Sequence, residues 1–77
     1  MTTIVIEGYT FRFYSSDRFE PAHMHVLRDR RVAKVWLDPV RLEHSRGYNR
    51  TEVGRILALT IEHRARLLGA WDEYFGR

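Results

Sequence analysis

Two histidines stand two residues apart in the segment EPAHMHV, which covers residues 20–26. Side chains two apart on a β-strand project from the same face, so the imidazoles of His23 and His25 would lie side by side. Imidazoles titrate near neutral pH and can serve as general acid and general base, for example in phosphodiester cleavage. We therefore take His23 and His25 as candidate catalytic residues, although the pattern by itself does not decide whether the protein is an enzyme.

Such a pair can also chelate zinc, copper, nickel or iron. Two ligands do not make a metal site. Further ligands would have to come from Glu20, Asp38, Glu43 or His44. Nothing in the spacing of these residues requires that role. The sequence leaves a metal open as an alternative, and our expectation is a site without metal or cofactor.

Arg64 is the third candidate for the catalytic site. It falls near the middle of the apolar stripe of a C-terminal helix, where a buried guanidinium is costly unless it is paired. Either it pairs with a carboxylate such as that of Asp17 or Glu20, with its stem along apolar surface, or it reaches a cleft at the end of the sheet and binds an anion.

Short strands must position the histidines. Four segments show the β-branched or alternating pattern of strands, namely residues 3–7, 9–14, 22–27 and 32–37. The links between them are short, which favours an antiparallel meander. Residues 40–47 fit either an edge strand or a single helical turn. We predict one α+β domain over residues 1–77, with a meander of three to four short strands.

One long C-terminal helix, packed on one face of the sheet, should complete the domain. Apolar residues recur at helical spacing over residues 50–75. Asn49 and Glu52 have the spacing of an N-terminal capping box, and Gly76 is a natural stop. The period of the pattern therefore changes from strand to helix near residue 50.

This helix would be too long for the domain. It would measure roughly 37 Å, whereas a domain of this size is only about 30 Å across. Either Gly69 interrupts the helix, or its last turns extend beyond the sheet. In the second case Trp71, Tyr74 and Phe75 would need a second subunit or another protein to cover them, and we expect them to form a partner interface.

The sheet face opposite the helix is a candidate nucleic-acid surface. Besides the histidines, alternation places Arg12, Tyr14, Lys34 and Trp36 on it. Arginine and lysine can pair with phosphates, and bases can stack on tyrosine or tryptophan. The alternative is an ordinary sheet face that contacts solvent or another protein.

Composition excludes several classes of protein. With 44% hydrophobic and 13% aromatic residues, the chain can form a globular core. It has no cysteine, which excludes disulfides and cysteine-based zinc sites.

No window approaches the ~20 apolar residues of a membrane span, and the N-terminus lacks the pattern of a signal peptide, so we expect a cytoplasmic protein. The net charge of +3 is modest, and all 13 basic residues except Lys34 are arginine, which suits phosphate or carboxylate contacts.

Five segments together resemble a known family in their order and sequence. They are FRFYSSD, EPAHMHV, AKVWLDPV, GYNRTEV and EHRARLLGAWDEYF. They resemble a family of short bacterial proteins that is known as domain of unknown function four-one-six-zero. The family's usual stretch has two prolines before the first histidine, and Ala22 stands in place of the second. The resemblance matches His23, His25 and Arg64 to motif positions without assigning their roles.

The resemblance implies a small α+β domain. It also implies a gene that often lies beside one for a second small protein, in an arrangement like a toxin–antitoxin pair. By that analogy we expect the toxin-like member, acting on RNA or on translation through a His/Arg surface, with a cognate small protein or further copies of itself as partners. The alternative is a non-enzymatic module that binds protein or nucleic acid.

Overall fold

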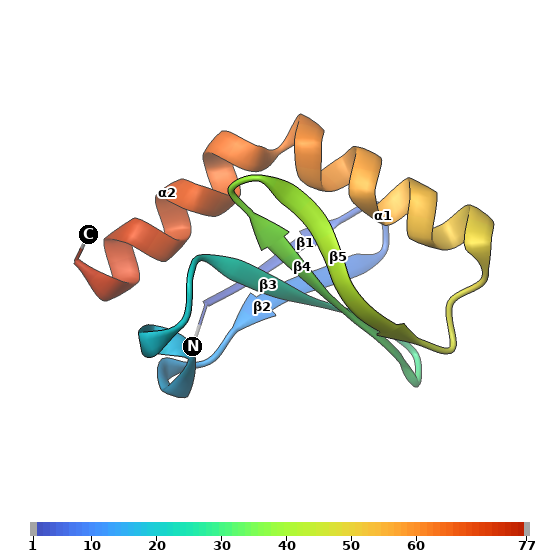
Figure 1. Cartoon of the computed structure of the whole chain (residues 1–77), viewed down its shortest axis with the longest axis horizontal. Helices are drawn as coiled ribbons and strands as arrows, with labels where there is room; N and C mark the ends of the chain where they lie inside the picture. The colour runs from blue at the N-terminus through green and yellow to red at the C-terminus, as the bar shows by residue number, and fades with distance from the viewer. Residues whose placement is uncertain (1, 77) are drawn as a thin grey trace.

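The chain begins with five consecutive antiparallel strands, as a computed structural model that describes residues 2–76 shows (Figure 1). The strands are β1 (Thr2–Ile6), β2 (Tyr9–Phe13), β3 (His23–Arg28), β4 (Arg31–Leu37) and β5 (Val40–Arg46). Each pairs with its neighbour in sequence, and a 3-10 helix, η1 (Ser15–Phe19), connects β2 to β3. The predicted α+β meander is confirmed. It has one strand more than the three to four expected, because residues 40–46 form an edge strand.

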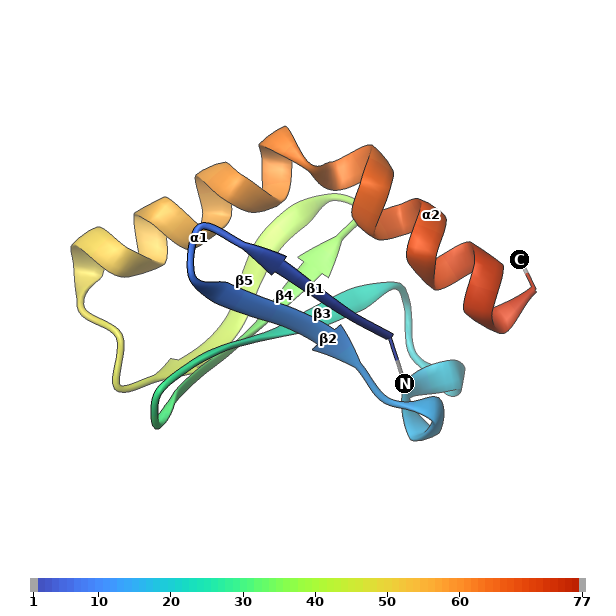
Figure 2. The same cartoon turned by 180° about the vertical axis from the view of Figure 1, so that it is seen from behind.

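The C-terminal helix is interrupted. Helix α1 (Arg50–Glu62) and helix α2 (Arg64–Phe75) meet at His63, whose φ and ψ are −105° and 17°. The prediction of one long helix is therefore wrong, and the break lies at His63 rather than at Gly69. The two helices form an arch over the sheet (Figures 1 and 2), within a molecule whose longest dimension is 34 Å. The bend lets both helices follow a sheet that a straight helix of this length would outreach.

The ends of the helices are fixed as the sequence predicted. The Asn49 side chain accepts a hydrogen bond of 2.8 Å from the backbone N–H of Glu52, which caps α1. Gly76 ends α2 in the left-handed conformation with φ of 74°, which glycine adopts without strain. No helix within residues 2–76 is long and apolar enough to cross a membrane.

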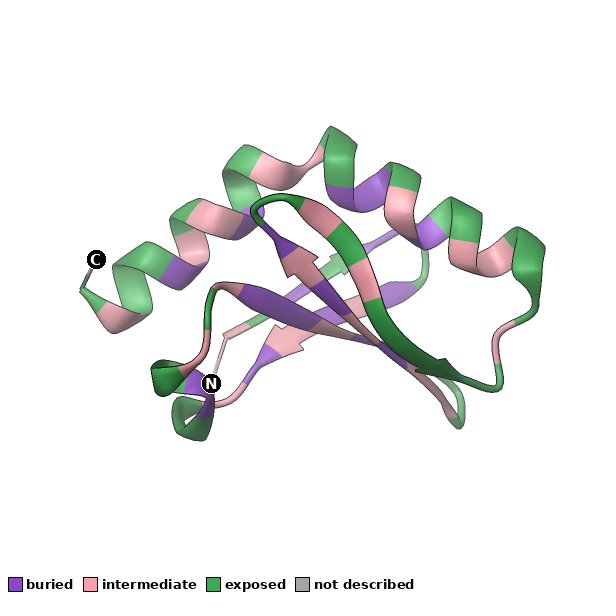
Figure 3. Ribbon diagram, in the orientation of Figure 1, coloured by how far each residue is buried: buried purple, intermediate pink, exposed green. Residues whose placement is uncertain are grey.

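The core lies between the helices and one face of the sheet. Buried residues alternate along β2 and β4, β3 buries Met24 and Val26 on the same face, and β1 and the helices contribute the remaining core (Figure 3). The side chains that fill it include Phe11, Phe13, Met24, Val26, Val35, Leu37, Ile56, Leu59, Leu67 and Trp71. Neither helix crosses the other face of the sheet (Figure 2), which leaves that face open, as the alternation predicted.

Candidate functional site

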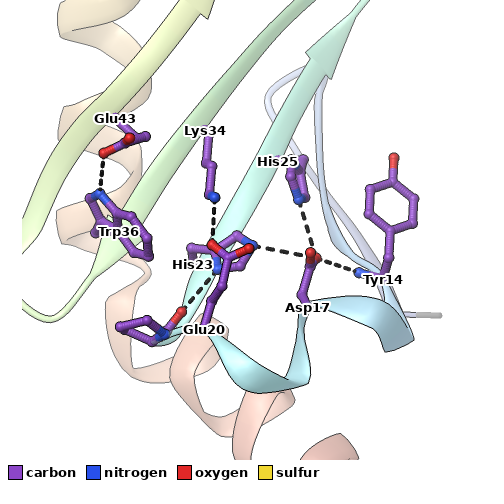
Figure 4. A network of polar contacts seen from close by, with 9 residues as sticks. Tyr14, Asp17, Glu20, His23, His25, Lys34, Trp36 and Glu43 are labelled. Carbon is purple, nitrogen blue, oxygen red and sulfur yellow. Dashed lines mark hydrogen bonds and ion pairs between the residues drawn. The ribbon is translucent and has the colours of Figure 1, made fainter.

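Asp17, His23 and His25 form a cluster where the sheet ends beside η1 (Figure 4). One carboxylate oxygen of Asp17, Oδ2, lies 3.1 Å from Nε2 of His25 and 3.3 Å from Nε2 of His23. The two imidazole rings have centroids 5.1 Å apart. The predicted juxtaposition of the histidines is therefore present, and a carboxylate that the sequence did not assign to it joins them.

Helix η1 aims this carboxylate at β3. Asp17 accepts a hydrogen bond of 2.9 Å from the backbone N–H of Tyr14, and its own N–H donates to the Tyr14 carbonyl. Burial alone would raise the pKa of Asp17. The Tyr14 hydrogen bond and the attraction between the carboxylate and the two histidines outweigh it, so the pKa lies below its ordinary value. The carboxylate is thus held ionised between the two rings.

His23 is completely buried. Its Nδ1 lies 2.9 Å from the carbonyl oxygen of Pro21, and its ring centroid lies 5.5 Å from that of Trp36 and 5.1 Å from that of Trp71. Alternation along β3 had placed the helix only on the Met24 side. In the structure Trp71 of α2 also lies against His23. A fully enclosed ring cannot touch a substrate, so His23 orients the site rather than reacting in it.

His25 is the accessible member of the cluster, with 20% of its side chain exposed. Its ring lies beside that of Tyr14, with centroids 5.0 Å apart. Burial lowers the pKa of His25, and the nearby Asp17 only partly offsets this effect. The imidazole therefore favours its neutral form, which has a nitrogen lone pair for a proton or a metal ion.

Arg64 is not brought to the histidines. Its Nε donates a hydrogen bond of 2.7 Å to the carbonyl oxygen of Leu37, and a terminal nitrogen lies 2.8 Å from a carboxylate oxygen of Asp38. The sequence suggested Asp17 or Glu20 as the partner of Arg64, but the ion pair forms with Asp38 instead. Arg64 therefore ties the start of α2 to the end of β4, which is a structural role.

A transverse row of basic side chains crosses the open face. The strand register places Thr3 opposite Arg12, Arg12 opposite His25, His25 opposite Lys34, and Lys34 opposite His44. Within residues 2–76, the buried Nε of Arg12 has no hydrogen-bond partner. Four of the five strands thus contribute one basic group each, and we call these residues the basic row: Arg12, His25, Lys34 and His44.

Two carboxylates reduce the net positive charge around Trp36. Lys34 Nζ lies 2.6 Å from a carboxylate oxygen of Glu20, and Nε1 of Trp36 donates a hydrogen bond of 2.8 Å to Glu43 (Figure 4). The register shift between β4 and β5 accounts for the second contact, since Lys34 pairs with His44 and the next residue with Leu42. Lys34 and Arg41 also lie over the Trp36 ring, 4.9 Å and 5.7 Å from its centroid. The predicted cationic and aromatic surface exists, with two carboxylates set into it.

The predicted partner interface is largely covered by the chain itself. Trp71 is only 2% exposed and packs edge-on against Phe13, with ring centroids 5.2 Å apart. Phe75 is half-buried, and its centroid lies 4.5 Å from that of Trp71. Trp71 is therefore covered without a second subunit, and a partner interface at Tyr74 and Phe75 stays a prediction. Tyr74 stays 43% exposed, and Phe19, which the sequence analysis did not select, is 88% exposed.

Comparison with known proteins identifies one family. No curated protein matches the chain, and no solved structure does. Residues 8–72 match the family described as Domain of unknown function (DUF4160), and this match includes the cluster, the basic row and Arg64. The chain therefore belongs to the DUF4160 family.

Proposed function

We propose that this protein binds RNA on the open face of its sheet, as the toxin-like member of a toxin–antitoxin-type pair. The observation that carries the proposal is the basic row, which crosses β2 to β5 on a face that neither helix covers. Single-stranded RNA is commonly recognised on such a surface, where basic groups follow the backbone and aromatic rings stack on bases.

The row offers phosphate contacts of two kinds. Arg12 is partly exposed, and its guanidinium forms no ion pair within residues 2–76, so its terminal nitrogens would pair with a phosphate while the buried Nε stays enclosed. Lys34 would have to exchange the Glu20 carboxylate for phosphate. Lys34 has 16% of its side chain exposed and Glu20 has 44%, so the exchange requires the Glu20 carboxylate to turn out into solvent.

Two aromatic rings flank the row and would stack on bases. Tyr14 lies against His25, and Trp36 lies beneath Lys34 and Arg41. Both rings are partly exposed. Base stacking on such rings contributes about 1–3 kcal/mol per base and tolerates any sequence. The proposed surface therefore predicts affinity for single strands with little sequence preference.

Fluorescence anisotropy with a labelled single-stranded RNA oligonucleotide tests the binding. We expect Arg12→Ala to weaken binding and to make the dependence of affinity on salt shallower by about one phosphate contact. Arg66→Ala removes the same charge from an exposed position on α2 and is the matched control. Equal affinity of the two variants would exclude the sheet face as the RNA surface.

Growth inhibition on expression tests the toxin-like role. The wild-type chain should slow growth, and Arg12→Ala combined with Trp36→Ala should relieve the inhibition, with the fold retained by circular dichroism. An inert wild-type chain would contradict this role. The anisotropy measurement would still report separately on RNA binding.

Protein binding is the second candidate, and a groove at the C-terminal end of the molecule favours it. The groove lies between η1 and the end of α2 and is lined by Ser15, Arg18, Tyr74 and Phe75. The exposed Phe19 follows Arg18 directly. If a cognate small protein docks there, Phe19→Ala and Tyr74→Ala should abolish its co-purification, whereas Arg12→Ala should not.

A further inference from the structure

The tautomer of His23 is set by its backbone partner. Nδ1 lies 2.9 Å from the Pro21 carbonyl oxygen, and a carbonyl only accepts hydrogen bonds, so Nδ1 carries a proton. In a neutral imidazole the other nitrogen, Nε2, then has a lone pair and no proton. The enclosed Nε2 therefore presents a lone pair to its surroundings.

A carboxylate lies close to that lone pair. Nε2 of His23 is buried and has no hydrogen-bond partner among residues 2–76, although Asp17 Oδ2 lies 3.3 Å away. Two electron-rich atoms at this separation in a buried place repel each other unless a positive centre lies between them. The two atoms lack hydrogen-bond geometry, so an N–H between them does not meet this need.

A metal ion satisfies all three side chains together. We propose that Asp17, His23 and His25 bind a divalent transition-metal ion of the zinc class. Their ligand atoms lie within 4.8 Å of one another. Tetrahedral ligands at zinc distances of about 2.0–2.2 Å are themselves about 3.3–3.5 Å apart, close to the 3.1 Å and 3.3 Å between Asp17 and the histidines.

The surroundings of the three ligands match those of a metal centre. Metal-bound histidines characteristically donate their other ring N–H to a carbonyl or carboxylate, as His23 does to Pro21. The carboxylate of Asp17 is oriented in turn by the backbone N–H of Tyr14. Two imidazole nitrogens favour zinc, cobalt, nickel or iron over magnesium and calcium, which prefer oxygen ligands.

The site would keep an open position. The chain supplies three ligands, and zinc centres with three protein ligands bind water or a substrate in the fourth position. His25 is the exposed ligand, so the open position would face the sheet surface that carries the basic row. The three metal ligands are different side chains from Arg12 and Lys34, which would contact phosphate. The metal site is therefore independent of RNA binding.

Cobalt titration of the untagged full chain, stripped with EDTA, tests the site. We expect one Co²⁺ per chain, with the intense visible d–d bands of a four-coordinate ion, and displacement of Co²⁺ by Zn²⁺. His25→Gln should weaken binding by more than 10-fold, since even the second-shell partners of metal ligands contribute 10–100-fold. His63→Gln, at the junction of α1 and α2 and outside both the cluster and the basic row, is the matched control and should bind like the wild type.

Thermal unfolding supplies a second readout. Saturating Zn²⁺ should raise the Tm of the wild type and of His63→Gln, because a ligand of the native state stabilises it. Asp17→Asn and His25→Gln should lose this shift. Absence of the cobalt bands, or equal metal affinity in His25→Gln and His63→Gln, would overturn the proposal.

Discussion

The two ends of the helix–sheet interface treat buried polar groups differently. Under α1, the hydroxyl of Thr60 is fully buried and donates a hydrogen bond of 2.7 Å to the carbonyl of Ile56. Under α2, His23 is equally buried, yet its Nε2 has no hydrogen-bond partner within residues 2–76. Folding usually leaves few such atoms, because each one costs stability. At the α1 end the buried hydroxyl is therefore hydrogen-bonded within the fold. At the α2 end a buried ring nitrogen is left without a hydrogen bond, which suits a bound ligand.

The largest expected effect comes from removing the ring that encloses His23. Trp71→Ala should lower the free energy of unfolding by about 3–5 kcal/mol, because it deletes a large buried side chain and leaves a cavity. Ile56→Ala at the α1 end should cost about 2–5 kcal/mol by the same mechanism. Urea unfolding measures both losses. Only Trp71→Ala should shift the NMR signals of the His23 ring, and equal shifts in the two variants would remove the distinction between the ends.

A smaller effect separates the polar groups themselves. Asp17→Ala should cost about 1–3 kcal/mol in metal-free protein, because the Tyr14 N–H loses its acceptor and both imidazoles lose their partner. Thr60→Val should cost less than about 1 kcal/mol, since the helix backbone still satisfies the Ile56 carbonyl. Urea unfolding of the two variants decides the matter. A loss for Thr60→Val that matches Asp17→Ala would contradict the comparison.

The last effect is confined to alkaline pH and concerns the α1 end. Tyr48 donates a hydrogen bond of 3.1 Å to the Val26 carbonyl, and burial, followed by its neighbours Tyr9 and Glu52, raises its pKa to about 12. Its contribution to stability is therefore fully present below the ordinary tyrosine pKa of about 10 and is lost as the pH rises through 12. Tyr48→Phe should remove that part of the alkaline loss. Unfolding curves between neutral pH and pH 12 measure it, and identical pH profiles would show that Tyr48 contributes nothing.

The sequence predicted the strands that alternate in burial and missed the features that depend on distant contacts. Strands β2 and β4 bury every second side chain, so their pattern was clear. Strand β5 buries none of its side chains fully, which explains why residues 40–47 were ambiguous. The helix breaks at His63 without glycine or proline, next to Arg64, which binds the end of β4. Gly69 is tolerated within α2, where an added Cβ would meet nothing.

The candidate site was half predictable. Strand alternation identified the pairing of His23 and His25, because it depends only on the two-residue period. Asp17 was visible only as a loop residue, since the 3-10 turn that aims its carboxylate gives no periodic signal. The burial of His23 depends on Trp71, which lies 48 positions away in the sequence. The spacing of residues within one strand or helix cannot predict a contact between residues so far apart in the sequence.

The unbroken strand order has a consequence for how quickly the chain can fold. Because every strand pairs with its predecessor, the sheet assembles from hairpins that each close a short loop. The three side chains of the cluster lie between residues 17 and 25, so they meet within one such step. Docking of the helices then joins them to the sheet. Because its strands pair in sequence order, this β-rich protein should fold faster than sandwiches or barrels of similar size.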